Sequence, residues 1–214
     1  MNEKRLVEIY YKIKLDIEQK CQQFKNVRES GELPVFKEMV FCLLTPQSKA
    51  EICWQTTEEI FLDDSVFKLS ANELSERLSK IRFKNNKASY IVALRNRFVK
   101  DNYPIIREFL LSDVQKNKIE LRNWLAKNIK GYGFKEASHF LRNVGMGRKL
   151  AILDRHILRN LLEVGVINEI PKSLSKSKYI EIEDKMRIFS SNIGIPLSHL
   201  DFVIWYNQTG RIFK

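Results

Sequence analysis

Apolar residues recur at intervals of three and four along almost the whole chain, and this spacing restricts what the chain can fold into. Residues three or four apart lie on the same side of an α-helix, so the pattern predicts helices that each bury one face. We expect helices over residues 6–24, 36–43, 48–61, 71–78, 85–99, 104–112, 118–128, 135–144, 154–162, 178–193 and 197–206. The predicted fold class is therefore all-α.

The breaks between these helices are short. Thr45-Pro46, the turn 131–133 and the junction 194–196 are the clearest of them, and none is long or low in complexity. A chain of 214 residues that is 44% hydrophobic can fill a core of its own. We therefore expect one unit over residues 1–214, with neither a coiled coil nor internal repeats.

The charge balance favours a nucleic-acid partner. Lys and Arg number 37 against 26 Asp and Glu, which gives a net charge of +11. Basic proteins of this kind include nucleic-acid binders, although ribosomal and membrane-surface proteins share the property. No apolar run approaches the roughly eighteen residues that a membrane span requires. We expect a cytoplasmic protein, associated with the nucleoid while it acts and without a membrane partner.

The cysteines and histidines predict no cofactor and no metal. Cys21, Cys42 and Cys53 form no C-x-x-C pair, and each lies in an apolar helical segment, as is usual for buried reduced thiols. The three histidines are scattered along the chain, and none has zinc-ligand spacing with a cysteine. We expect neither a structural zinc nor an iron-sulfur cluster.

Residues 119–145 read as a helix-hairpin-helix motif, in which the turn Lys130-Gly131-Tyr132-Gly133-Phe134 joins two amphipathic helices. Glycines at alternate positions allow positive φ and bring N–H groups close to an anion, and the N-terminus of the next helix adds positive charge. We expect Lys130, Gly131 and Gly133 to contact a DNA phosphate. An ordinary helical hairpin whose glycines only end one helix and start the next is the alternative.

Lys135 and Asp154 are the candidate catalytic pair. Lys135 stands in the first turn of the second hairpin helix, where the helix N-terminus disfavours another positive charge, and a free amine there is a suitable nucleophile. Asp154 follows the apolar run 150–153. Its carboxylate suits a helix cap, and equally the stabilisation of a cation developing on a sugar.

The segments KGYGFKEAS and LAILDRHIL resemble the hairpin and the aspartate-ending loop that define the helix-hairpin-helix (HhH-GPD) DNA glycosylase superfamily. The lysine-to-aspartate spacing matches as well. In that superfamily a lysine at the position of Lys135 marks enzymes that are also strand-cleaving lyases, and Asp154 takes the place of the catalytic acid. The resemblance implies a two-lobed helical fold, with a catalytic loop at about 145–156 and the N- and C-terminal helices in one lobe. The loop departs from the pattern in having Gly145 and Gly147 and no proline.

Segments 44–50, 81–88 and 200–214 extend the resemblance to the compact archaeal-type 8-oxoguanine DNA glycosylase/AP lyase group. The endonuclease III branch is disfavoured, because it normally ends in a four-cysteine cluster motif and this chain has no cysteine after Cys53. The group implies removal of 8-oxoguanine through a Schiff base on Lys135, followed by strand cleavage 3′ to the abasic site by β-elimination. The expected partner is double-stranded DNA containing oxidised guanine, bound by a monomer.

The same resemblance suggests residues that recognise the extruded base. Phe83 and Trp205 would stack on its two faces, although core packing is an equal alternative for both. Lys214 would reach back so that its carboxylate reads the base, unless it belongs to a frayed end. Asp201 would hydrogen bond the base or, slightly favoured, cap its own helix.

The remaining candidates face the DNA. Gln47 lies in a polar turn where a side chain can fill the gap left by the base or touch the opposite base, while the neighbouring Thr45, Pro46 and Ser48 equally suit a helix cap. The basic residues expected to meet phosphates, alongside Lys130, are Lys49, Arg82, Lys84, Lys87 and Arg148.

Two alternative functions remain open at this stage. A lyase-competent glycosylase acting on oxidised pyrimidines would share the hairpin and the Lys135–Asp154 pair. A non-catalytic helix-hairpin-helix module would use the hairpin only to bind phosphates.

Overall fold

The structure is a computed structural model that describes residues 2–112 and 117–214, and over these residues it is mostly helical. The all-α prediction is confirmed. Among the described residues, no helix is both long enough and apolar enough to span a membrane. The elements are α1 (Glu3–Glu29), α2 (Glu32–Leu44), α3 (Ala50–Leu62), α4 (Ser65–Lys68), α5 (Ala71–Arg77), α6 (Lys84–Phe98), β1 (Val99–Lys100), β2 (Tyr103–Pro104), α7 (Ile106–Leu111), α8 (Lys118–Asn128), α9 (Phe134–Asn143), α10 (Arg155–Glu163), α11 (Lys176–Asn192) and α12 (Leu197–Thr209).

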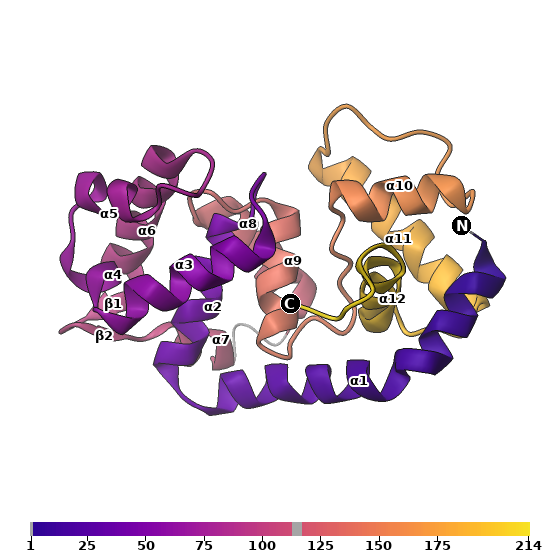
Figure 1. Ribbon diagram of the computed structural model, residues 1–214, viewed down its shortest axis with the longest axis horizontal. Helices are drawn as coiled ribbons and strands as arrows, with labels where there is room; N and C mark the ends of the chain where they lie inside the picture. The colour runs from indigo at the N-terminus through magenta and orange to yellow at the C-terminus, as the bar shows by residue number, and fades with distance from the viewer. Residues whose placement is uncertain (1, 113–116) are drawn as a thin grey trace.

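Two separate hydrophobic cores divide the helices into two lobes. The first core draws its side chains from α2 through α9, with Phe36, Phe41 and Phe140 among the buried residues. The second draws them from α1, α10, α11 and α12, with Leu6 and Tyr179 at its centre. The long helix α1 runs beneath both lobes and packs against α2, α9 and α12 (Figure 1). Helix α1 therefore packs against both lobes and connects them.

A short β-hairpin lies between α6 and α7, where the sequence predicted that one helix would end at Val99 and the next would begin at Pro104. Strands β1 and β2 pair antiparallel, with Val99 opposite Pro104. The two linking residues, Asp101 and Asn102, have φ values of 51° and 60°. A two-residue turn with both residues at positive φ matches the twist of a β-hairpin, and Asp and Asn tolerate that conformation better than most residues. Helix α7 consequently starts only at Ile106.

The turn between α8 and α9 is fixed by one glycine and one tyrosine. Gly131 has a φ of +84°, and a Cβ at this position would lie 2.5 Å from the ring of Tyr90. Any other residue would therefore meet both backbone strain and a clash. The hydroxyl of Tyr132 donates to the carbonyl of Met39 at 2.7 Å, which anchors the turn to α2. Gly133, with a φ of −102°, does not take the positive φ that the sequence analysis expected of both glycines.

The loop that connects α9 to α10 is held by two side chains of α11. The carboxylate of Glu183 accepts a hydrogen bond from the amide of Ala151 at 2.7 Å and a bidentate contact from Arg122 of α8 at 2.8 Å. The hydroxyl of Tyr179 donates to the carbonyl of Ala151, also at 2.7 Å. Arg122 and Glu183 are both almost completely buried. The pair thus joins the first hairpin helix, the second lobe and the loop that leads to Asp154.

We predict that Glu183→Ala lowers the free energy of unfolding by about 3–5 kcal/mol, because the substitution leaves the Arg122 guanidinium buried without its partner. Urea denaturation followed by circular dichroism measures this loss. Arg187 also pairs with Glu183, but at 3.8 Å and with 39% of its side chain exposed. Arg187→Ala should therefore cost less than about 1 kcal/mol. Equal losses in the two variants would contradict the importance of the buried pair.

Candidate active site

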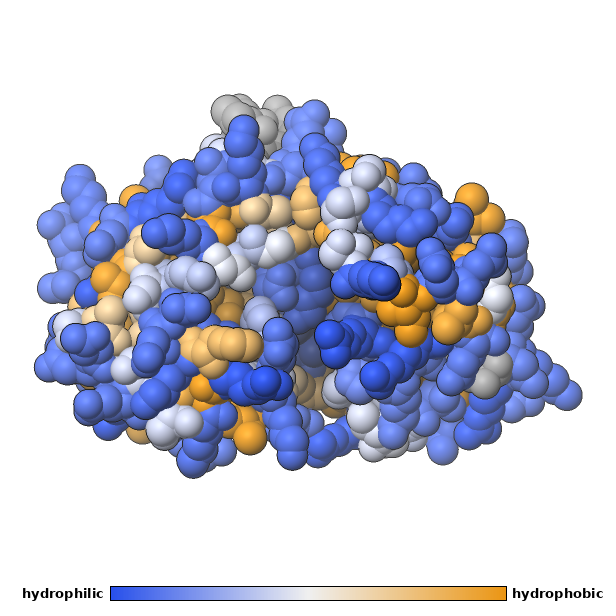
Figure 2. Space-filling view, turned by 90° about the horizontal axis from the view of Figure 1, so that it is seen from above, coloured by the Kyte–Doolittle hydropathy of each residue, from blue (hydrophilic) through white to orange (hydrophobic). Residues whose placement is uncertain are grey.

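A cavity of about 720 Å³ lies between the two lobes and contains most of the predicted site residues. Its walls come from the loop after α2, from the first turns of α9, from the segment 152–158 and from α12 with the residues that follow it. Figure 2 shows a hollow near the middle of the molecule, bordered mainly by hydrophilic residues. A cavity of this size is within the range of small-molecule sites, and a nucleobase fits it.

Lys135 lies in the first turn of α9 and lines this cavity with 21% of its side chain exposed. Its Nζ donates to the hydroxyl of Thr45 at 3.0 Å. A carboxylate oxygen of Glu136 lies 3.6 Å from the same nitrogen. The other oxygen of Glu136 accepts the amide N–H of Gly133 at 3.0 Å, which fixes the carboxylate over the start of the helix. Thr45 and Glu136 thus contact the Lys135 amine from two sides, and Lys135 still lines the cavity.

Asp154 is the N-cap of α10 and also lines the cavity. One carboxylate oxygen accepts the amide N–H of Ile157 at 2.8 Å. The helix-cap interpretation is therefore correct in geometry, but it does not exclude the second role, because the half-buried side chain faces the same space as Lys135. The cap fixes where the carboxylate points. Lys135 comes from the first lobe and Asp154 from the loop that enters the second.

The two aromatic residues predicted to stack on a base occupy different environments. Trp205 of α12 lines the cavity, and its ring meets that of His156 edge to face with 5.3 Å between centroids. Phe83 is 53% exposed and stands just before α6 with a φ of 58°, next to the cavity-lining Arg82. Phe83 itself does not border the cavity. The structure therefore brings only Trp205 of the pair to the wall.

Asp201 does not cap its helix, and the sequence analysis was wrong to favour that role. Helix α12 begins at Leu197 with Pro196 as its N-cap, so Asp201 lies one turn inside the helix. Its carboxylate pairs with Arg142 of α9 at 2.6 Å, and both residues line the cavity. Burial raises the pKa of Asp201, and the neighbouring guanidinium partly offsets this effect. The pair links α9 and α12 across the two lobes.

Lys214 is folded into the cavity. Its ammonium forms an ion pair with the buried Glu38 of α2 and lies 3.1 Å from the ring centroid of Trp54. Glu38 also accepts a hydrogen bond from the side-chain amide of Asn143 at 2.9 Å. Burial lowers the pKa of the Lys214 ammonium, while Glu38 acts in the opposite direction. Glu38 and Trp54 were not predicted as site residues, since neither belongs to a recognisable motif.

The loop between α2 and α3 carries Gln47 and Lys49, which are exposed and line the cavity. Gln47 has a φ of 55°, which turns the chain sharply. No side chain of the turn caps α3, because its N-cap is Lys49 and makes no side-chain cap bond. Instead, the hydroxyl of Ser48 accepts from the amide of Arg82 at 3.1 Å. The helix-cap alternative for this turn is therefore wrong.

Lys87 was predicted to contact phosphate, and the structure contradicts this. The residue is only 4% exposed, and its ammonium donates to the carbonyls of Leu44 and Pro46 at 2.7 Å and to the Ser48 hydroxyl at 3.2 Å. All three N–H bonds are therefore used to hold the loop that carries Gln47. Burial lowers the pKa of Lys87 to about 8.

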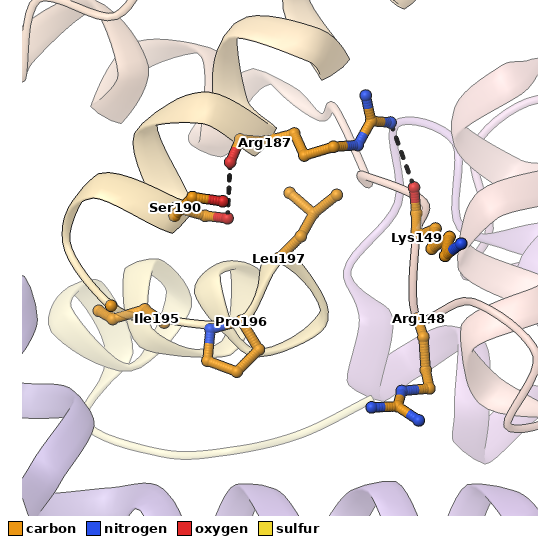
Figure 3. A pocket seen from close by; sticks show the side chains of 9 residues that line it. Arg148, Lys149, Arg187, Ser190, Ile195, Pro196 and Leu197 are labelled. Atoms are coloured by element: carbon orange, nitrogen blue, oxygen red, sulfur yellow. Dashed lines mark hydrogen bonds between the residues drawn. The ribbon is translucent and has the colours of Figure 1, made fainter.

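The hairpin and Arg148 lie at opposite ends of α9. Lys130, Gly131 and Gly133 are exposed, although the Gly133 N–H is already bound by Glu136. Arg148 lies beyond the C-terminal end of the helix, where it lines a separate, shallow pocket (Figure 3). The structure does not bring Arg148 to the hairpin or to the cavity that contains Lys135.

Several cavity residues were missed by the sequence analysis, namely Thr45 as a partner of Lys135, together with Glu136, His139, Arg142 and His156. For two of them, the position relative to Lys135 in the sequence could have indicated that they lie in the site. Glu136 follows Lys135 directly, and His139 lies one helical turn after it, on the same face of α9. Arg142 and Asp201 meet only because the two lobes pack together, and no spacing within the chain indicates this contact.

A lysine at the start of the second hairpin helix, facing a cavity that also receives an aspartate from the following loop, is the arrangement of helix-hairpin-helix DNA glycosylases. A family model described as 8-oxoguanine DNA glycosylase matches residues 17–195. The chain belongs to this family.

Relatives cover nearly the whole chain. It is 45% identical over 207 residues to the 8-oxoguanine DNA glycosylase/AP lyase of Fusobacterium nucleatum, covering 96% of this chain and 94% of the relative. The structure resembles that of the Methanocaldococcus jannaschii 8-oxoguanine glycosylase/lyase in complex with 15mer DNA containing 8-oxoguanine, with a TM-score of 0.87, 40% identity and 99% of each chain covered. The 8-oxoguanine DNA glycosylase of Thermotoga maritima also gives a TM-score of 0.87, at 34% identity, covering 99% of this chain and 98% of the other.

We predict a pH dependence of stability that depends on Lys87. Its folded-state pKa of about 8 lies below the ordinary value of 10.5, so between these values the unfolded chain holds a proton that the folded chain lacks. The free energy of unfolding contributed by this group therefore rises with pH in that window, by about 1 kcal/mol between pH 8 and pH 9.

Urea unfolding of the wild type and of Lys87→Met across this range measures the effect. The difference in stability between the two proteins should increase with pH. Lys80→Met, which changes an exposed lysine, is the control and should leave the slope of the wild type unchanged. Parallel curves for wild type and Lys87→Met would contradict the lowered pKa.

Proposed function

We propose that the protein is a bifunctional base-excision repair enzyme that releases 8-oxoguanine from double-stranded DNA and then cleaves the strand 3′ to the abasic site. The observation that carries the proposal is the amine of Lys135, which stands in the inter-lobe cavity within hydrogen-bonding distance of Thr45 and opposite the loop that ends in Asp154. A base must leave the DNA stack to bring its C1′ to such an amine, and the cavity can accept it.

The first step is attack of the free amine of Lys135 on C1′ of the nucleotide. The N-glycosidic bond breaks, its electron pair leaves with the base, and the base takes up a proton. Positive charge develops on the sugar as this bond weakens, and the fixed carboxylate of Asp154 stabilises that charge. Glu136, whose oxygen lies 3.6 Å from Nζ, is placed to take the proton that the attacking nitrogen gives up.

The second step is β-elimination from the covalent intermediate. The sugar ring opens to give a Schiff base between Lys135 and C1′, which makes the C2′ protons acidic. Loss of one of them breaks the C3′–O bond, and the 3′ phosphate departs with the electron pair. Hydrolysis of the Schiff base then regenerates the amine.

The residues around the cavity suggest how the substrate is held. Trp205 offers a stacking face to the extruded base, while Asp201 and Lys214 offer polar groups at the cavity wall. Phe83, exposed beside Arg82, is suited to contact the DNA or the base as the duplex docks. Gln47, Lys49, Lys130 and the backbone around Gly131 and Gly133 lie on exposed surface and would contact the DNA. Action as a monomer in the cytoplasm, near the nucleoid, remains part of the proposal.

We predict that borohydride traps the wild-type protein covalently on duplex DNA containing 8-oxoguanine, because it reduces the Schiff base to a stable amine. Lys135→Gln should abolish trapping, while its affinity for the same duplex falls no more than a few-fold. A gel-shift titration and denaturing electrophoresis measure the two properties. Lys127→Gln, which changes an exposed lysine of α8, is the control and should trap normally. Trapping by Lys135→Gln would exclude this lysine as the nucleophile.

We predict that Asp154→Asn lowers the rate of base release by about 10²–10³-fold, the range seen when an electrostatic partner of the transition state is removed. Asn caps helices as well as Asp, so thermal unfolding of the variant should match that of the wild type. Single-turnover release of 8-oxoguanine measures the rate. A wild-type rate of base release in this variant would show that Asp154 serves only as the N-cap of α10.

A further inference from the structure

His139 is a buried cavity residue whose ring nitrogens make no regular hydrogen bond within the described part of the chain. It lies one turn after Lys135 on α9, lines the same cavity, and is only 6% exposed. Neither ring nitrogen makes a hydrogen bond of regular geometry with a described residue, and the main chain of Lys214 lies close enough to the ring for a weak one. The ring is held by an edge-to-face contact with Phe41, with 5.6 Å between centroids. Its orientation is therefore set by packing and not by hydrogen bonding.

An arrangement of this kind is costly, because a buried donor or acceptor without a partner loses its hydration and gains nothing in return. Nearby polar groups of the site are satisfied. Arg142 binds Asp201, and Lys135 binds Thr45. The two nitrogens of His139 are the buried side-chain atoms left unsatisfied in the described part of the chain. Unsatisfied polar groups at a cavity wall are typical of a site that completes its bonding with a ligand.

Burial, together with neighbouring cations, keeps the ring of His139 neutral. Burial has the largest effect and lowers the pKa of the imidazole well below its ordinary value, and the cations Arg142 and Lys135 lower it further. A weak hydrogen bond to the main chain of Lys214 raises the pKa of the imidazole, while the charge of the same residue lowers it. A neutral imidazole presents one N–H donor and one nitrogen acceptor. Both hydrogen-bonding functions are thus available to an uncharged, planar ligand.

We propose that His139 is a base-contacting residue that hydrogen bonds the extruded 8-oxoguanine, in addition to the residues assigned above to base recognition. The inference rests on the proposed function. A purine edge carries donors and acceptors side by side, and a ring nitrogen of His139 pairs with one of them once the base fills the cavity. Lys214 beside the ring is held by its side-chain contacts to Glu38 and Trp54, and His139 already lines the cavity next to it.

The test compares two reactions of the same protein, one that involves the base and one that does not. The first substrate is a duplex with a single 8-oxoguanine, and the second is the same duplex with a preformed abasic site. In His139→Phe, which keeps a ring against Phe41, we expect release of 8-oxoguanine to fall about ten- to hundredfold in kcat/KM. Cleavage at the abasic site should stay within about threefold of wild type, since no base is bound there.

Two further variants complete the design. His139→Gln retains a donor and an acceptor and should recover part of the lost base release. His199→Phe makes the same change in the second lobe, where His199 lies by the hydroxyl of Tyr10, and should behave as wild type in both reactions. If His139→Phe does not fold, His139→Ala replaces it, and imidazole added to the reaction should then restore 8-oxoguanine release.

The outcomes separate the inference from the proposed function. Normal release of 8-oxoguanine by His139→Phe, or an equal loss in both reactions, overturns the role of His139 alone. So does a folded His139→Ala variant that imidazole does not rescue. A wild-type protein that cleaves the abasic site but leaves 8-oxoguanine in place overturns the proposed substrate, and the inference with it.

Discussion

The buried carboxylate of Glu183 is the contact on which the geometry of this protein most depends. It receives the guanidinium of Arg122 from the first hairpin helix and the amide of Ala151 from the loop that follows the second. These partners belong to different lobes, so a single group sets the position of the hairpin relative to the loop. Lys135 and Asp154 line the same cavity, and this carboxylate joins the hairpin that carries one of them to the loop that ends in the other. Glu183 lies 29 residues after Asp154 and 48 residues after Lys135, the two residues proposed as the catalytic pair.

The basic residues of this chain, whose net charge is +11, fall into a buried group and an exposed group. The buried ones form contacts that stabilise the structure. Lys87 ties down the loop that carries Gln47, Arg142 joins α9 to α12, and Lys214 is held against Glu38. Others, such as Lys49 and Lys130, remain exposed, where they are suited to meet a polyanion. A positive balance alone therefore does not say which lysines face DNA, because burial decides the role of each.

Much of the fold was predictable from local pattern. Helical periodicity located α8 and α9, and the glycine at position 131 marked the turn between them, because only glycine accepts both its φ and its close approach to Tyr90. The β-hairpin at Asp101 and Asn102 was missed, since a helix and a short strand can share the same apolar residues. Lys87 was misplaced for a different reason. A lysine in a polar stretch is usually exposed, and nothing nearby in the sequence indicates the carbonyls of Leu44 and Pro46 that bind it.

The sequence by itself determined the helical class and the hairpin, and it suggested the pair formed by Lys135 and Asp154, because each of these depends on residues close together in the chain or on a family pattern with fixed spacing. Only the tertiary structure decided which polar groups meet across the lobes. Arg122 pairs with Glu183, and Arg142 pairs with Asp201. In each buried pair the two partners are about sixty residues apart in the chain. The isolation of His139 is likewise a property of packing. Whether a polar atom finds a partner depends on every segment folded around it, and no local pattern records that.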